Sequence, residues 1–330
     1  MTNDQRQTIL PVVALIVSML IWSVSGIAIK HALMVLPPFT MIVLRFVPSV
    51  LLMLCIGLIW RNNPLFGLQK LQLRDLPLFL IAGFCQPLLY YLLETFTYDA
   101  LNSPTIAETL LSTSPLIAPL FAAVLLRERI TRYNILGIIV STLGVFALIL
   151  WEKDTQLSTL NAQLSIGNPW GVALAFAAVS AAVIDSIMMR KVPARYSSLS
   201  FIFYAQLISL FFFLPIWFFR EGPAAIKALD LSQLSTLNFS QLSTLNSQLF
   251  IALGCVAYLT VFASVIAFIL FCYALRHVGV TQANAFNNIR PAFTALWMFL
   301  FFNETLPLGK WIGIAMIIVG LFVCQKKQIR

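Results

Sequence analysis

Ten long apolar segments, separated by short polar stretches, constrain the fold of this 330-residue chain more than any other feature. Each is about as long as the roughly 20 residues that an α-helix needs to cross the hydrocarbon core of a bilayer. Charged residues make up 10% of the chain, too few to cover a soluble domain, in which they average about 25%. We therefore predict an all-α integral membrane protein with ten transmembrane helices, at 10–30, 39–60, 76–98, 104–126, 133–151, 169–189, 198–219, 250–274, 281–302 and 308–325.

The distribution of Lys and Arg predicts which loops face the cytoplasm. With an even number of helices both termini lie on one side, and placing them inside puts 14 of the 21 Lys and Arg in inside loops and 5 in outside loops. Cytoplasmic loops carry such an excess of positive charge. We therefore expect a multi-pass protein of the plasma (bacterial inner) membrane with both termini in the cytoplasm. Scattered cations between apolar runs fit a lipid surface, and no nucleic-acid partner is expected.

An internal repeat relates the two halves of the chain. A shift of 176 residues overlays 104–147 on 280–323, with nine identities in 44 positions. Ordered matches include Pro115 with Pro291, Gly137 with Gly313, and Gly144 with Gly320. Each copy holds five predicted helices, and because five is odd the second copy crosses the membrane inverted, as in many secondary transporters. We predict one unit over 1–152 and an inverted unit over 168–330, joined by an outside linker at 153–167.

A second repeat carries less information. The hexapeptide Gln-Leu-Ser-Thr-Leu-Asn occurs three times, at 156–161, 233–238 and 241–246. All copies fall in predicted outside loops, where insertions cost little free energy. We interpret 231–248 as a low-complexity loop insertion.

Ionisable side chains inside the predicted helices are candidates for function, because each needs a partner or a wet cavity. Arg45, Glu94 and Glu108 fall at similar depth in the outer half of the membrane. They are predicted either to form a structural ion pair or to build a substrate-binding (Arg45) and proton-coupling or gating (Glu94, Glu108) site. Tyr90 stands one turn from Glu94 and is a candidate substrate-binding residue, although tyrosines near an interface are most often membrane anchors. Asp185 is interpreted as an interfacial acid rather than a transport residue.

The most polar stretch inside a predicted helix lies in the ninth, TQANAFNNIRP. Asn284, Asn287 and Asn288 follow i, i+3, i+4 spacing and so share one helix face, and Arg290 adds a charge close to mid-bilayer. We predict that all four residues line a substrate-binding cavity. The alternative is that the asparagines hold neighbouring helices together by hydrogen bonds.

Two prolines indicate where the helices are broken. Pro291 follows Arg290, and Pro115 occupies the equivalent place in the first repeat. Proline removes a backbone donor and frees carbonyl groups of the preceding turn. Paired interruptions at matching positions of two repeats point to the binding site of a transporter.

These residues resemble the drug/metabolite transporter superfamily, specifically its EamA-type branch. The resemblance lies in PLIAPLFAAVLLRERITRYNILGIIVSTLG, repeated as PAFTALWMFLFFNETLPLGKWIGIAMIIVG, and in IWSVSGIAIKHALMVLPPFTMIVLR of the first helix pair. It implies ten helices in two inverted five-helix repeats and transport of small metabolites, often export of amino-acid-like or carboxylate compounds. Helices six and seven carry no counterpart of Arg45.

The sequence thus predicts a secondary transporter that works by alternating access between the two repeats. The alternative is an intramembrane lipid-modifying enzyme, which needs a cluster of nucleophile and base that is not found here. There is no P-loop, no G-x-S-x-G motif and no pair of histidines at ligand spacing, so we expect no catalytic residues, metal or cofactor. The expected partners are a small-molecule substrate and the lipid bilayer, with a homodimer left open.

Overall fold

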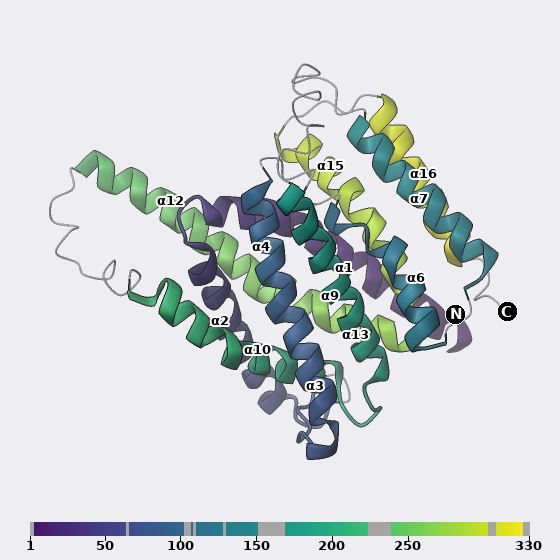
Figure 1. Ribbon diagram of the computed structural model, residues 1–330, viewed down its shortest axis with the longest axis horizontal. Coiled ribbons are helices and arrows are strands. Elements are labelled where there is room, and N and C mark those ends of the chain that lie inside the picture. Colours follow the sequence, from purple (N-terminus) through teal and green to yellow (C-terminus); the bar gives the residue numbers. More distant parts are fainter. Residues whose placement is uncertain are drawn as a thin grey trace.

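The computed structural model describes residues 3–63, 66–101, 107, 110–127, 130–150, 169–223, 239–302 and 308–325. All regular structure in these residues is helical, and the helices form one bundle (Figure 1). Within them, six helices are long and apolar enough to cross a membrane: Ile9–Leu33, Pro38–Ile59, Leu73–Ala100, Pro169–Lys191, Ser198–Arg220 and Ser247–His277. Shorter apolar helices cover Ser114–Leu125, Arg132–Ala147 and Trp311–Cys324. The all-helical, multi-pass membrane class is therefore confirmed.

The first half of the chain runs through eight described elements. They are α1 (Asn3–Leu33), α2 (Pro38–Ile59), the 3₁₀ turn η1 (Leu73–Asp75), α3 (Leu76–Gly83), the π-turn η2 (Phe84–Leu89), α4 (Tyr90–Ala100), α6 (Ser114–Leu125) and α7 (Arg132–Leu150). The second half runs through α9 (Pro169–Lys191), α10 (Ser198–Arg220), α12 (Phe239–Tyr258), the π-turn η4 (Leu259–Ile266), α13 (Ala267–His277), α14 (Val280–Ala285), the 3₁₀ turn η5 (Phe286–Asn288), α15 (Ile289–Phe302) and α16 (Leu308–Gln325).

Three of the apolar segments are interrupted near their middle. In η2, Gln86 has an extended backbone (φ −147°, ψ 124°) immediately before Pro87. In η4, the helix widens to π geometry, and its Ala263 and Ser264 carbonyls accept hydrogen bonds from side chains of other helices. In the third, α14 passes into the 3₁₀ turn η5 just before Pro291. Such interruptions turn backbone polar groups toward the bundle interior, and they frequently occur at functional sites.

The terminal helices of the two halves, α7 and α16, lie side by side at one edge of the bundle (Figure 1). A Cβ atom on Gly137 would lie 2.5 Å from the Gly320 carbonyl oxygen, and one on Gly144 would lie 2.7 Å from the Gly313 carbonyl oxygen. The helices are therefore antiparallel and in backbone contact, as small residues permit. Gly137 corresponds to Gly313 and Gly144 to Gly320 in the repeat. The shift of 176 residues therefore maps the contact between Gly137 and Gly320 onto the contact between Gly313 and Gly144.

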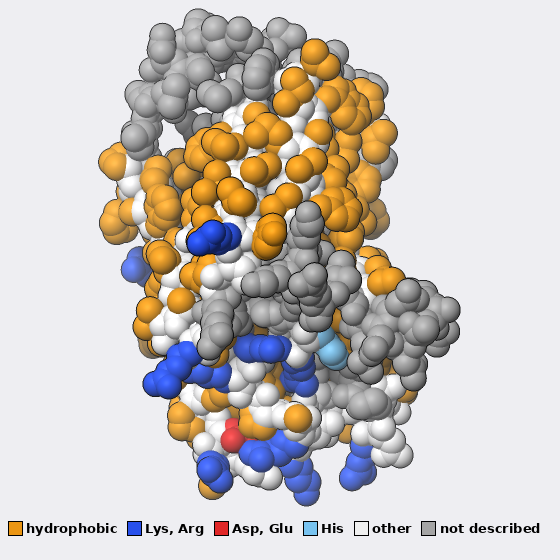
Figure 2. Space-filling model, turned by 90° about the vertical axis from the view of Figure 1, so that its right-hand side faces the viewer, with side chains coloured by type: hydrophobic (Ala, Val, Ile, Leu, Met, Phe, Trp, Pro, Cys, Tyr) orange, Lys and Arg blue, Asp and Glu red, His pale blue; other side chains and the backbone are white. Residues whose placement is uncertain are grey.

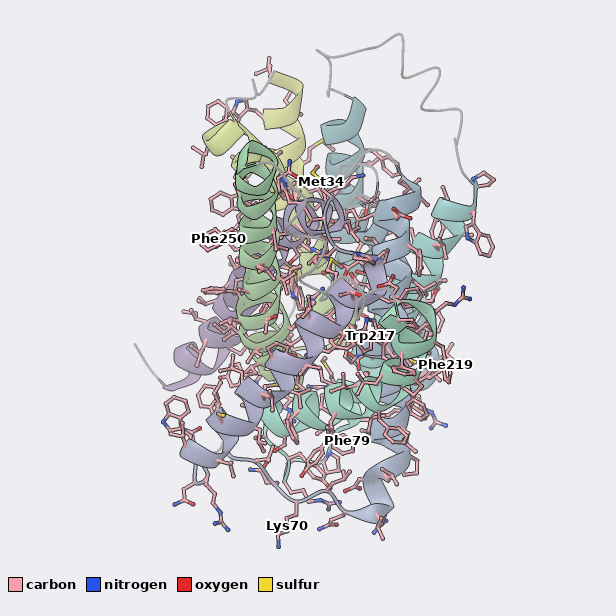
Figure 3. The ribbon with its side chains drawn as sticks, turned by 90° about the vertical axis from the view of Figure 1, so that its left-hand side faces the viewer. Met34, Lys70, Phe79, Trp217, Phe219 and Phe250 are labelled. Atoms are coloured by element: carbon pink, nitrogen blue, oxygen red, sulfur yellow. The ribbon has the colours of Figure 1, made fainter. Side chains whose placement is uncertain are left out.

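The bundle has two distinguishable ends. Met34 lies toward the upper end and Lys70 at the lower end, whereas Phe219 and Phe250 point away from the bundle on opposite sides (Figure 3). Both phenylalanines are largely exposed, as expected of side chains that face lipid. On the face shown in Figure 2, Lys and Arg lie over the middle and lower part, and hydrophobic side chains cover the described surface above.

A network of hydrogen bonds closes the lower end, and we call it the clamp: Gln69 and Asp75 with Arg195, Tyr196 and Ser200. Asp75 forms an ion pair with Arg195 and accepts a hydrogen bond from the Tyr196 hydroxyl at 2.7 Å. The Gln69 side chain accepts a hydrogen bond from the Ser200 hydroxyl at 2.8 Å. The clamp thereby fastens the segment before α3 to the start of α10.

One predicted loop differs from the structure. The segment 239–248, which contains the third hexapeptide copy, belongs to α12 and not to a loop insertion. These Ser, Thr, Gln and Leu residues form the start of α12, and the strongly apolar residues come after them. The helix therefore begins in a segment whose own helix propensity is weak. The copies at 156–161 and 233–238 lie outside the described residues.

Candidate functional site

A cavity of about 50 Å³ lies inside the bundle, with walls from both halves of the chain. A water molecule needs roughly 10–15 Å³ of such space, so the cavity has room for about four waters. It is the place where the broken segments meet, because η2, α14 and the start of α15 all contribute to its wall. Six of the residues predicted as site residues line it: Arg45, Tyr90, Glu94, Asn284, Asn287 and Arg290.

Arg45 contacts several polar and aromatic side chains of other helices. Its Nε atom donates to the Ser264 hydroxyl at 2.7 Å, and its guanidinium lies 3.8 Å from the centre of the Tyr91 ring. One of its terminal nitrogens is 3.8 Å from a Glu94 carboxylate oxygen, and Tyr90 donates to the other Glu94 oxygen at 2.9 Å. The arginine is 3% exposed. A buried charge with this many partners is stabilised mainly by the protein, which fits the structural ion-pair interpretation.

Arg290 and two asparagines form another part of the wall. The Asn287 amide donates to the Ser114 hydroxyl at 2.9 Å, and the Asn284 amide donates to the Val280 carbonyl at 3.0 Å. Arg290 is 5% exposed and stands in the first turn of α15. The contact between Asn287 and Ser114 joins the interrupted segment of the second half to the start of α6 in the first half.

The prediction that Asn288 lines the cavity is wrong. Its amide donates to the Ser141 hydroxyl at 2.6 Å and to the Thr142 hydroxyl at 3.3 Å, both on α7. The reason is the 3₁₀ turn η5, which has three residues per turn, so that i and i+3 stay aligned while i+4 rotates away. Asn288 therefore ties two helices together, which was the alternative for the group.

The two prolines stand at helix starts. Pro115 is the second residue of α6 and Pro291 the third residue of α15. Proline is tolerated in the first turn because the backbone donor it lacks has no intrahelical acceptor there. Glu108, predicted to act in proton coupling or gating, lies outside the described residues.

Sequence reasoning missed other parts of the wall, including Trp22, Gln86, Tyr91 and Phe268. The alternative that Tyr90 is a membrane anchor does not hold, because Tyr90 and its neighbour Tyr91 are buried. The Gln86–Pro87 pair inside an apolar segment was a signal that could have been used, since proline in a helix interior breaks it.

The expectation for Asp185 also fails. Its side chain is 1% exposed and faces a second, smaller cavity rather than the membrane surface. Among the described residues, no group of three or more His, Cys, Asp or Glu side chains is placed to hold a metal ion.

Comparison with known proteins places this architecture in a family. The EamA-like transporter family matches residues 9–150 and again 169–324, which together make up most of the chain. The chain belongs to the EamA-like transporter family. It is thus a member of the drug/metabolite transporter superfamily, and its family is one of transporters and not of enzymes.

Relatives of this EamA-like protein carry transporter names. It is 25% identical over 299 residues to the "Uncharacterized transporter YetK" of Bacillus subtilis, covering 89% of this chain and 80% of the relative. It is 21% identical to an "Uncharacterized transporter" of Archaeoglobus fulgidus, covering 96% and 99%. It is 23% identical to the "Probable terminal-alkyne amino-acid exporter" of Streptantibioticus cattleyicolor, covering 80% and 77%. A crystal structure of a protein with 16% identity superimposes with a TM-score of 0.67 over 98% of this chain and 99% of the other, which shows the shared fold.

Proposed function

We propose that this protein is a secondary transporter that moves a small carboxylate-bearing metabolite, of the amino-acid class, across the bacterial inner membrane by alternating access. The observation that carries the proposal is the cavity between the two halves, which holds two buried arginines and a row of amides. Substrate sites of such transporters lie between repeats, at interrupted helices. The similarity to a protein named as an amino-acid exporter supports the substrate class.

The substrate carboxylate is assigned to Arg290, which lines the cavity from the first turn of α15. Arg290 presents a planar guanidinium, which binds carboxylates with two parallel hydrogen bonds. Asn284 and Asn287 lie on the same wall and supply further polar groups for the rest of a small polar molecule.

The proposal is tested by uptake and efflux in reconstituted liposomes against a panel of amino acids and the corresponding amino-acid amides. The amides keep the ammonium group and the side chain but lack the carboxylate. We expect saturable transport of one or more amino acids and little or none of the matching amide. Equal transport of an amino acid and its amide would show that Arg290 does not bind a substrate carboxylate.

The proposed membrane arrangement has ten spans in two inverted units, 1–152 and 168–330. The antiparallel contact of α7 with α16 through exchanged glycines supports the inversion, because repeat-related helices meet in opposite directions. Two separate family matches, one in each half, also support it. The clamp at the lower end is then the closed cytoplasmic gate, and opening it would connect the cavity with the cytoplasm.

Weakening the clamp is expected to favour the form that is open at the lower end. In a cysteine-free background, Ile202→Cys places a thiol in the buried cavity above the clamp. Adding Asp75→Asn removes an ion pair worth about 0–1 kcal/mol, so the rate of labelling by impermeant maleimide should rise up to about fivefold. Inverted membrane vesicles expose this end to the reagent. The control is Arg74→Gln, which changes one exposed charge beside the clamp; an equal rise there would show that the clamp is not the gate.

The orientation predicts which single cysteines react in intact cells. Ser158→Cys and Ser240→Cys are expected to be labelled by impermeant maleimide, because the proposed orientation has 153–167 and the segment around 240 on the outside. Ile130→Cys, in the basic loop after α6, should react only after the cells are opened. Labelling at position 130 in intact cells would reverse the topology.

A further inference from the structure

A buried carboxyl lies outside the cavity described above. Asp185 stands near the end of α9, and its Oδ1 atom has no hydrogen-bond partner among the described residues. Its side chain is almost completely buried. A negative charge in such a place is far less stable than a neutral carboxyl, because no hydrogen-bond donor of the described residues reaches Oδ1 to replace the water that it has lost. In this closed form the group is therefore a carboxylic acid that holds its proton.

Asp185 faces a small cavity of its own, with a volume of about 10 Å³. That is the space of about one water molecule, so no substrate with a carbon skeleton fits. The side chains of Phe201 and Ile202 make one part of the wall, and the amides of Gln86 and Gln206 make another. The site is therefore large enough for a proton, delivered by one water, and for little else.

The side-chain oxygen atoms around this cavity are too few to make a coordination shell for a hard metal cation. The Gln206 amide donates to the Ser264 carbonyl at 3.0 Å and accepts from the Ser49 hydroxyl at 2.5 Å, so both of its atoms are occupied. Hard cations take six or more oxygen ligands. The Asp185 carboxyl and the Gln86 side chain cannot supply such a set.

The charged and titratable groups around Asp185 do not neutralise it. The titratable side chains that interact electrostatically with the Asp185 position are Cys85 in η2, Tyr91 in α4 and Cys272 in α13, and none of them is a cation. The cations on the packed elements are Arg190 and Lys191 on α9 itself and Arg276 on α13. Arg190 donates to the carbonyls of 275 and 276, and Arg276 donates to those of 196 and 197. Both arginines are thus bound to backbone oxygens at the lower end, and Lys191 is exposed.

Asp185 lies between the substrate cavity and the clamp. Its cavity shares two wall residues, Gln86 and Phe268, with the substrate cavity. Toward the clamp, the wall of the Asp185 cavity includes Phe201, whose ring centre is 5.5 Å from that of Phe79. Phe79 also packs against Tyr196 of the clamp at 5.1 Å and lies just inside the lower end (Figure 3). If the clamp opened and the rings of Phe79 and Phe201 separated, water from the lower end would reach Asp185.

We propose that Asp185 is the proton-binding site that couples transport to a pH gradient, a role that rests on the transport function proposed above. With the clamp closed, the carboxyl keeps its proton. With the clamp open, water reaches it, the carboxylate becomes stable, and the proton passes to that water as hydronium. Coupling requires that the next proton reach Asp185 from the opposite side of the membrane, so that each full cycle carries one proton across.

The first test needs no substrate and uses dicyclohexylcarbodiimide, an apolar reagent that reacts with protonated carboxyls. Purified protein is treated over a range of pH and the modified residue is identified by peptide mass spectrometry. We expect modification at Asp185, higher at acidic than at alkaline pH, and none at this position in Asp185→Asn. An unmodified Asp185 at every pH, in protein that elutes as a single folded peak, would overturn the proposal.

The second test follows a pH dye trapped inside proteoliposomes while each member of the amino-acid panel is added. Asp185→Asn keeps the size and the neutral state of the closed form, so it should fold and still exchange labelled for unlabelled amino acid at equal pH. We expect it to lose completely the accumulation driven by a pH gradient. Asp185→Glu should retain this accumulation. Ser180→Ala changes a partly exposed hydroxyl on the outer surface of the same helix and should behave as wild type.

The outcomes separate the two proposals. If the wild-type protein transports none of the panel, the proposed function fails, and the carbodiimide result alone still decides whether Asp185 titrates. If the wild type transports an amino acid without response to pH, or if Asp185→Asn keeps the full response, the coupling role is wrong. If a Na⁺ gradient replaces the pH gradient, the site takes a metal cation and the proton assignment is overturned.

Discussion

Replacing Arg290 by lysine is expected to cut transport of a carboxylate substrate by about tenfold to a hundredfold, because hydrogen bonds to charged groups contribute about 1.5–3 kcal/mol. Lysine keeps the positive charge but loses the fork of two parallel donors. The protein should still fold, since the volume of the side chain and its charge change little. Initial rates in proteoliposomes measure the effect, and amount and monodispersity in detergent measure folding.

Two further variants make the Arg290 experiment decisive. Arg290→Gln removes the charge and should abolish transport of the acid. Arg132→Lys makes the same chemical change at an exposed position at the start of α7, far from the cavity wall, and should transport as wild type. A well-expressed Arg290→Gln protein with wild-type rates would exclude Arg290 as the carboxylate ligand.

Gly320→Ala is expected to destabilise the protein by about 1–3 kcal/mol or more, the range for overpacked interiors. Its new Cβ atom would lie 2.5 Å from the Ser141 nitrogen and 2.7 Å from the Gly137 carbonyl oxygen. Both atoms belong to the backbone of α7, so no side chain can rotate to make room. The two helices must move apart along their whole contact. Loss of the monodisperse peak after heating to a series of temperatures gives the shift in midpoint.

Gly254→Ala is the matched control for Gly320→Ala. Gly254 stands in α12, and apart from its own stretch of helix no heavy atom of the described residues lies within 4 Å of the position that its Cβ would take. Alanine has a higher helix propensity than glycine by about 0.8–1.0 kcal/mol, so this variant should melt at the same temperature as wild type or higher. If both variants shift the midpoint downward alike, backbone contact between α7 and α16 is not what the glycine provides.

The parts of the site that follow from local pattern were predictable. The placement of Arg290 beside Asn284 and Asn287 needs only helical spacing and a proline, and the structure brings these residues to one wall. Asn288 was misplaced because the same spacing was assumed to continue through a 3₁₀ turn, whose period differs.

Other features depend on contacts between distant parts of the chain. The partner of Arg45 on η4 is a serine more than 200 residues away, exposed to the arginine by a π-turn that no motif marks. The burial of Asp185 depends on the packing of α3, η2, α4 and α13 around α9, and on the α10 side chains that line the same small cavity. Its distance from Arg190 along the sequence suggested an interfacial position, but α9 turns the acid inward. The described helices were located well, because length and hydropathy determine them.

The small volume of the central cavity has a kinetic consequence. In the proposed transport cycle, a closed form with room for about four waters would act as a sieve on molecular size. An amino acid with a short side chain would be enclosed and released on the far side. A longer analogue with the same carboxylate would reach Arg290 from the open form but block closure. Such analogues would bind and stall the cycle, so the chain's best inhibitors should be elongated versions of its own substrates.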